Sequence, residues 1–202
     1  MADTGWRIAG TGANVAAEGG GQTWANPGNI TNATLSSAIA VEATGATQNL
    51  RATNFGFAIP AGMSIAGVEA RISRRAPQGG DVRDFNLRLV VANSLTGANR
   101  ASADKWPASF GDAEYGSPSD LWSVSLTPEQ VNASTFGVQL RANAVVKDDP
   151  GVQAIWMRVH YEEPEKTYIA HNGLLIPAKP HVADGGLLKP AKRHVYNGGW
   201  RS

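Results

Sequence analysis

The sequence contains no cysteine in its 202 residues. This absence excludes a disulfide scaffold, a thiolate metal site and a thiol nucleophile. Charged side chains are also scarce, since Asp, Glu, Lys and Arg make up 17% of the chain against about 25% in an average domain. The 18 basic and 17 acidic residues leave a formal net charge of +1. That charge is too small for the whole molecule to attract nucleic acid or anionic lipid.

The sequence also lacks a long hydrophobic run. No stretch approaches the roughly 18 uninterrupted apolar residues that a membrane helix needs. Residues 2–7 form neither the basic nor the apolar part of a signal peptide. We therefore expect a protein that is made in a cytoplasm, is soluble there and does not contact a membrane.

Composition divides the chain into three zones. Residues 1–33 are rich in Gly, Ala, Asn and Thr and predict an extended N-terminal arm with turns. Residues 34–163 carry nearly all of the strand-like periodicity. Residues 164–202 are rich in Gly, Pro, Lys and His and contain an internal repeat. This division indicates one domain between two arms.

The middle zone has the period of β-strands. Apolar residues occupy every second position in four stretches, 68–74, 85–91, 136–144 and 155–161. That spacing is typical of strands with one buried face. We predict an all-β fold, an antiparallel β-sandwich or jelly roll of about six to eight strands with extended N- and C-terminal arms. Weaker strands are expected near 37–43 and 48–57.

Helical signals are nearly absent. The best lies in the run Thr127–Asn132, where Thr127 can cap a helix, Pro128 suits the first turn and Gln130 completes a capping box. We predict a single helical turn there, before the strand that begins near Phe136.

Groups that could carry catalysis or bind a metal are sparse in the middle zone. No Gly-x-Ser-x-Gly, His-Glu-x-x-His or phosphate-binding Gly-rich motif occurs. His160 falls on the polar side of its strand, so we expect an ordinary surface or interface residue. Six carboxylates lack the spacing of a calcium loop, and we interpret them as solvated loop residues. They are Asp81, Asp84, Asp104, Asp112, Glu114 and Asp120. We therefore predict no catalytic residue, no metal site and no cofactor.

Six tryptophans raise the alternative of a carbohydrate-binding site, because exposed aromatic rings stack on sugar faces. Trp106 and Tyr115, on one long loop, are the candidate glycan-binding residues. The competing interpretation, which we favour, buries Trp24, Trp106 and Trp122 under loops at the ends of the sandwich. Trp156 falls on the polar side of its strand, which predicts contact with another chain or with an arm.

The C-terminal zone repeats itself. Residues 172–182 align with residues 185–195, and eight of the eleven aligned pairs are identical. A third copy begins at Asn197. Each copy is too small to bury its own apolar side chains, so we predict an arm that docks on a neighbouring subunit. The candidate docking residues of this arm are Leu174, Leu175, Leu187, Leu188 and Trp200.

Charge is divided between the body and this arm. From residue 164 onward there are six basic and two acidic residues, which give +4. The preceding 163 residues carry 12 basic and 15 acidic residues, which give −3. A basic arm suits docking on an acidic neighbour. Contact with nucleic acid ranks below this interpretation, because Leu and Pro separate the lysines of the arm.

Several segments carry a resemblance. They are Trp24–Ile30, Leu50–Val68, Tyr115-Gly116, Asp120–Trp122, Phe136–Val138 and Val159–Tyr161. Together they resemble a β-sandwich domain of structural proteins of tailed bacteriophages. The segment His194–Arg201 is similar to the Gly-Gly-Trp repeats that end many phage virion proteins. Leu174 and Leu187 stand where the usual repeat carries Trp.

The resemblance implies a non-enzymatic virion structural protein, made in the cytoplasm of a bacterial host. Its expected place is the tail, baseplate or fibre, with anchoring through the arms. The alternatives are a capsid decoration protein and a carbohydrate- or receptor-binding module. The expected partners are other virion proteins and copies of itself, as a homo-oligomer for which a trimer is one option. A host surface glycan would be the partner under the receptor-binding alternative.

Overall fold

The computed structural model describes residues 1–33, 36–164, 168–171 and 174–177. The chain forms two compact units, Met1–Pro164 and Glu165–Ser202. Apart from two short helices, the regular secondary structure of the described residues consists of strands, which pair in an antiparallel manner.

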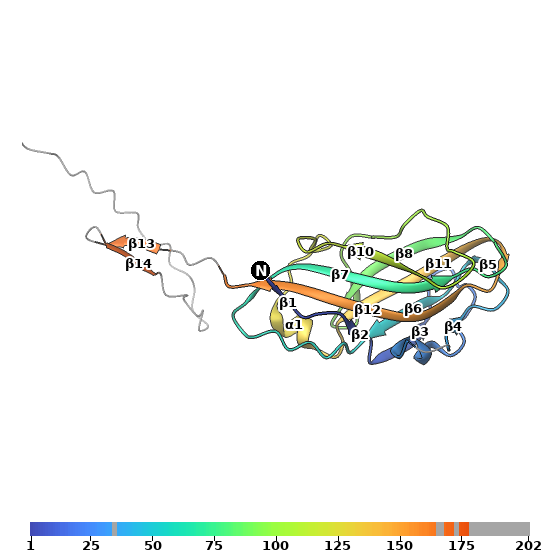
Figure 1. The fold of residues 1–202 in the computed structure, drawn as a ribbon, viewed down its shortest axis with the longest axis horizontal. Helices are drawn as coiled ribbons and strands as arrows, with labels where there is room; N and C mark the ends of the chain where they lie inside the picture. Colours follow the sequence, from blue (N-terminus) through green and yellow to red (C-terminus); the bar gives the residue numbers. More distant parts are fainter. Residues whose placement is uncertain (34–35, 165–167, 172–173, 178–202) are drawn as a thin grey trace, which may run out of the picture. The chain divides into compact units, whose positions relative to one another are not determined.

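The first sheet of the larger unit, sheet A, is built on two long strands. Strand β12 (Gly151–Glu162) pairs with β7 (Ser64–Arg75), and β10 (Gly111–Gly116) pairs with the other side of β7. Three short strands pair with the other edge of β12. They are β1 (Ala2–Asp3), β2 (Arg7–Ile8) and β4 (Ala38–Ile39). Figure 1 shows β1 and β2 beside β12.

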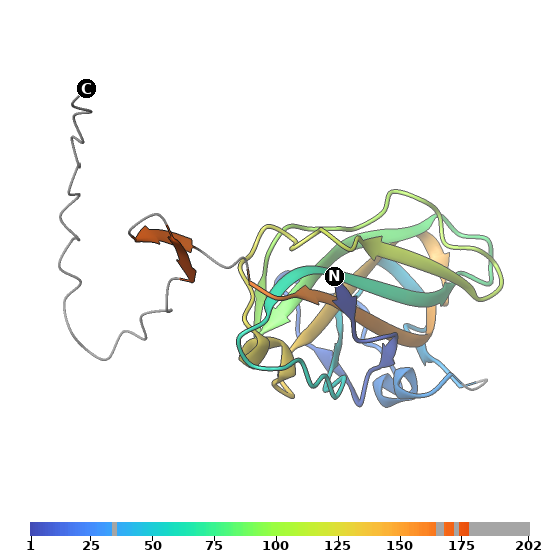
Figure 2. The ribbon, with the colours of Figure 1, turned by 60° about the vertical axis from the view of Figure 1, so that its left-hand side comes forward.

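The second sheet, sheet B, has the strand order β3-β6-β11-β8-β9, and β5 also pairs with β11. These strands are β3 (Thr11–Val15), β5 (Ala43–Ala46), β6 (Asn49–Thr53), β8 (Val82–Val91), β9 (Ser94–Thr96) and β11 (Gly137–Asp148). The two sheets lie face to face (Figure 2), and one buried cluster joins them. It contains Ile72 and Met157 from sheet A with Leu87 and Leu140 from sheet B. The predicted all-β sandwich is confirmed.

The alternation of apolar residues explains the long strands. In β7 the side chains of Val68, Ala70 and Ile72 are buried in the core, while Arg71 between them is half-buried on the outer face. Strand β10 was expected to be part of a long loop. Its sequence, Gly-Asp-Ala-Glu-Tyr-Gly, has only one large apolar side chain and two terminal glycines, so it gives almost no periodic signal.

The N-terminal segment is not a separate arm. Strands β1 and β2 extend sheet A, and β3 joins sheet B. Between them, the Ala9 N–H donates to Ile155 O and the Gly10 N–H donates to Thr53 O, so the chain crosses from one sheet to the other. Further on, Trp24 is buried in the core. The expectation of an arm over residues 1–33 was wrong because pairings this short leave no periodic pattern in the sequence.

The predicted helical turn is confirmed as α1 (Pro128–Asn132), and a 3-10 turn, η1, spans Pro27–Thr31. The Gln130 N–H donates to Thr127 Oγ1 at 3.3 Å, and the Thr127 N–H donates to Gln130 Oε1 at 2.9 Å. This capping box satisfies donors that the first helical turn leaves free.

The smaller unit contains one hairpin among its described residues, β13 (Tyr168–His171) paired with β14 (Leu174–Pro177). The predicted docking residues Leu174 and Leu175 belong to β14. The other three, Leu187, Leu188 and Trp200, lie outside the described residues. In the described part of the chain, no helix is long and apolar enough to cross a membrane.

The crossing of the N-terminal segment can be tested at Gly10. A Cβ atom there would lie 2.5 Å from the Asn54 carbonyl oxygen, whereas at Gly28 it would meet nothing within 4 Å. We expect Gly10→Ala to lower the free energy of unfolding by about 1–3 kcal/mol, and Gly28→Ala to change it by less than about 0.5 kcal/mol. Urea unfolding measures both. Equal stabilities of the two variants would mean that the segment is not packed on the sheets.

Candidate functional site

A β-bulge in β8 determines what lies between the two sheets. The pairing of β11 moves from Arg141 opposite Asn86 to Ala142 opposite Asp84, so Phe85 is an extra residue. Side chains therefore change sides at this point. Phe85 is 52% exposed and Asp84 is buried. Simple alternation predicts the opposite, with Phe85 in the core and Asp84 in solvent.

The carboxylate of Asp84, buried on β8 of sheet B, binds groups from sheet A and from the loop between β9 and β10. Its Oδ1 accepts hydrogen bonds from the guanidinium of Arg74 on β7 and from Trp106 Nε1, the latter at 2.9 Å. Its Oδ2 accepts hydrogen bonds from the Tyr115 hydroxyl on β10 at 2.8 Å and from the Ser102 N–H at 2.9 Å. Four donors saturate the carboxylate, which is what a buried ion pair requires to be tolerated.

Tyr115 stays a hydrogen-bond donor in this cluster. Burial raises the pKa of its phenol, and the neighbouring charge of Asp84 raises it further. The ring of Tyr115 also lies 5.7 Å from the Arg74 guanidinium, and the Trp106 ring lies 5.3 Å from it. The cluster therefore consists of an arginine and a carboxylate enclosed by two aromatic rings.

These contacts correct two expectations. Trp106 and Tyr115 are 4% and 6% exposed, so neither ring offers a face to a sugar, and the glycan-binding interpretation of this pair is wrong. Trp24 and Trp122 are buried as well. Asp84 was expected to be a solvated loop residue, yet it belongs to β8 and lies in the core.

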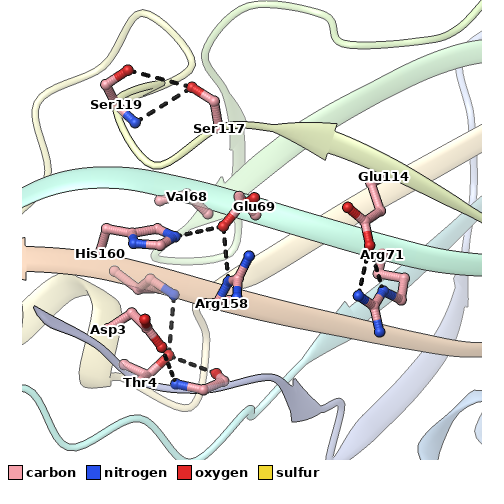
Figure 3. A network of polar contacts seen from close by, with 12 residues as sticks. Asp3, Thr4, Val68, Glu69, Arg71, Glu114, Ser117, Ser119, Arg158 and His160 are labelled. Atoms are coloured by element: carbon pink, nitrogen blue, oxygen red, sulfur yellow. Dashed lines mark hydrogen bonds and ion pairs between the residues drawn. The ribbon is translucent and has the colours of Figure 1, made fainter.

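The outer face of sheet A carries a second network of polar contacts (Figure 3). Glu69 Oε2 lies 2.5 Å from His160 Nε2 and accepts a hydrogen bond from Arg158 Nε at 2.8 Å. Arg71 donates two hydrogen bonds to Glu114, at 2.6 and 2.9 Å. The ring of Trp6 lies 4.3 Å from the Arg71 guanidinium and 4.6 Å from that of Arg158, so it bridges the two ion pairs.

His160 was expected on the surface but is 7% exposed. In sheet A it lies opposite Gly67. A Cβ on Gly67 would lie 2.3 Å from the Pro118 carbonyl oxygen. The backbone of the loop after β10 therefore covers this part of the outer face. Trp156, the other residue predicted on this face, is half-buried and pairs with Ile8 of β2.

Chemically, the arrangement on this face neutralises charge. Partial burial raises the pKa of Glu69, but the hydrogen bonds from Arg158 and His160 outweigh it and lower that pKa. The hydrogen bond that Arg158 donates to Glu69 in turn raises the pKa of Arg158. Among the described residues, no hydroxyl group hydrogen-bonds to His160, and no three His, Asp or Glu side chains gather as metal ligands.

A pocket of about 320 Å³ lies beside β10. Its lining comes from β10, Arg74 and the loop between β9 and β10. The carboxylates in this lining are Asp104, Asp112 and Glu114, and its cations are Arg74 and Lys105. Both cations are already paired, Arg74 with Asp84 and Lys105 with Asp81. The pocket is therefore polar, with an excess of negative charge.

The outer face of sheet B differs from that of sheet A in its charge. The cross-strand pairs Arg51–Gln139 and Gln139–Arg88 place two arginines on this face, and Arg141 lies 5.1 Å from the exposed Phe85 ring. In the described ranges none of these three arginines forms an ion pair with a carboxylate. This face has an excess of positive charge.

No protein-family model and no curated protein matches the chain. Among solved structures, the chain is similar to a Clostridium thermocellum endo-1,4-beta-D-xylanase 10B fragment of CBM22-1 and GH10 modules complexed with xylohexaose. The sequences are 11% identical and the TM-score is 0.34. The match covers 76% of this chain but 26% of the xylanase chain. A likeness at this level indicates no function for the protein.

The Asp84 cluster predicts a large loss of stability when its charge is removed. Asp84→Asn leaves Arg74 buried without a counter-ion, so we expect the free energy of unfolding to fall by about 3–5 kcal/mol. Tyr115→Phe, which removes one hydrogen bond, should cost about 1–3 kcal/mol. The control Glu114→Gln breaks an exposed pair and should cost less than about 1 kcal/mol. Denaturant unfolding that ranks all three variants alike would contradict the role given to Asp84.

The lowered pKa of Glu69 predicts a pH dependence. Its ion pairs stabilise the fold above the usual Glu pKa of 4.5, and this contribution disappears as the pH falls through the folded-state pKa. The difference in melting temperature between wild type and Glu69→Gln should therefore shrink between about pH 6 and pH 3. Exposed Glu18→Gln serves as the control. A difference that is constant over this range would show that Glu69 is not stabilised in its charged form.

Proposed function

We propose that the protein is a non-enzymatic structural component of a bacteriophage virion, associated with the tail, baseplate or fibre. The division of the chain into a sandwich and a separate C-terminal unit is the observation that carries this proposal. The bacteriophage resemblance of the sandwich and of the Gly-Gly-Trp-like repeat supports it.

The C-terminal unit favours a docking role. Its described part is one hairpin of two four-residue strands. An isolated two-stranded hairpin is at best marginally stable in water, and a repeat of this size cannot bury its own apolar side chains. A surface supplied by another subunit would stabilise the hairpin and bury the apolar side chains of the repeat. Weak contacts of this kind become strong when symmetry repeats them in one assembly.

The surface of the sandwich suits contacts with other proteins better than it suits catalysis. On the outer face of sheet A, each arginine of the network is engaged by a carboxylate and the histidine is covered. On the outer face of sheet B, Arg51, Arg88 and Arg141 leave positive charge available, and Phe85 is exposed beside them. An acidic surface of another virion protein would complement this face.

Deleting residues 165–202 tests the proposal. The remaining unit, Met1–Pro164, contains both sheets and their core, so it should keep its circular dichroism spectrum and melting temperature. We expect the truncated protein to be absent from purified particles, as measured by quantitative mass spectrometry. Full-length Gly28→Ala is the matched control and should be incorporated normally. Normal incorporation of the truncated protein would overturn the docking role.

The same measurement on wild-type particles separates the two virion locations. About three to twelve copies per particle would place the protein in the tail or neck, as proposed. Hundreds of copies, on the order of the capsid subunits, would instead assign it to capsid decoration.

A further inference from the structure

The outer edge of β10 is the exposed edge of sheet A. On the opposite side of the sheet, β1, β2 and β4 cover β12. Among the described residues, β10 pairs with β7 alone, and no backbone hydrogen bond joins its other edge to any loop. A six-residue strand therefore presents unpaired N–H and C=O groups. Such an edge is a template for an additional strand.

The charge along this edge selects the strand that can bind. Asp112 and Glu114 occupy alternate positions of β10, and the adjacent pocket adds Asp104. Glu114 is paired with Arg71, so Asp112 and Asp104 carry most of the free negative charge. Asp112 has no ion-pair partner within the described part of the chain. Since the cations of the pocket are already paired, an acidic segment would be repelled and a basic segment would be attracted.

The chain itself contains a segment of this chemistry. Residues 178–202, outside the described residues, carry five basic side chains and one acidic side chain, a net charge of +4. Within them, residues 191–197 (Ala-Lys-Arg-His-Val-Tyr-Asn) lack Gly and Pro, lie between Pro190 and Gly198, and are long enough for the six residues of β10. The matching stretch of the preceding repeat contains Pro180, which cannot donate to a strand ladder.

We propose that residues 191–197 of one copy add as a strand to the outer edge of β10 in a neighbouring copy. Successive side chains of a strand point to opposite faces of the sheet, so one of Lys192 and Arg193 would lie on the face that carries Asp112 and Glu114. The inference rests on the proposed function, in which the C-terminal unit docks on other subunits, and it names the surface that receives the segment. Backbone pairing supplies the register, and the carboxylates supply the selectivity for this basic repeat.

Zero-length carbodiimide cross-linking of the full-length protein tests this directly, because it joins a lysine amine to a carboxylate in contact with it. An equal mixture of ¹⁵N-labelled and unlabelled chains identifies links between copies by their mixed isotopes. We expect mixed-isotope peptides that join Lys192 to Asp104, Asp112 or Glu114. The absence of such peptides, or links found only within one copy, would overturn the proposal.

Two proline variants separate strand addition from charge attraction. Val195→Pro keeps every charge but removes an N–H from the segment, so the Lys192 links should fall about tenfold, the effect of losing one ladder hydrogen bond. Val182→Pro, at the matching position of the preceding repeat, should leave them unchanged. Equal yields for both variants would contradict strand addition.

This outcome is independent of the deletion of residues 165–202. Loss of incorporation without links to β10 would leave the docking role intact and refute this surface. Links to β10 together with normal incorporation of the truncated protein would support this surface and refute the docking role in the particle.

Discussion

The buried carboxylate of Asp84 is the contact on which the arrangement of this sandwich depends. The bulge at Phe85 turns Asp84 inward, where it meets Arg74 and Tyr115 of the opposite sheet together with Trp106. A charge in a core is tolerated only when its donors are fixed, so the cluster holds β10 and the loop before it in place against β8. The pocket and the exposed edge of β10 follow from that position.

The two outer faces distribute charge differently. On sheet A, Glu69 and Glu114 pair with arginines beside the ring of Trp6. Within the described part of the chain, Asp112 on β10 has no ion-pair partner. On sheet B, Arg51 and Arg141 bind backbone carbonyls and an amide rather than carboxylates, as in the hydrogen bonds from Arg141 to Thr47 O and from Arg51 to Gln139 Oε1. Among the described residues, the positive face of sheet B and the negative edge of β10 are therefore the surfaces that carry charges without ion-pair partners.

The long strands could be read from the sequence because their apolar residues alternate, as in β7 and β12. The Asp84 cluster could not be predicted, because one extra residue at Phe85 reverses the alternation and periodicity does not reveal a bulge. A signal was present in Arg74, which continues the phase of Val68, Ala70 and Ile72 and so lies on the buried face. A charged residue in phase with a buried row implies a buried partner. The pairing of β1 and β2 left no such signal, because two-residue strands have no period.

The protein is thus a sandwich with a second, C-terminal unit, for which we propose a role in docking on other subunits. Hydrogen–deuterium exchange, compared between the free protein and the protein in purified particles, tests this claim most directly. The expected result is slower exchange after assembly in residues 165–202 and along β10, with no change in β7 or β12. Unchanged exchange in residues 165–202 would contradict it.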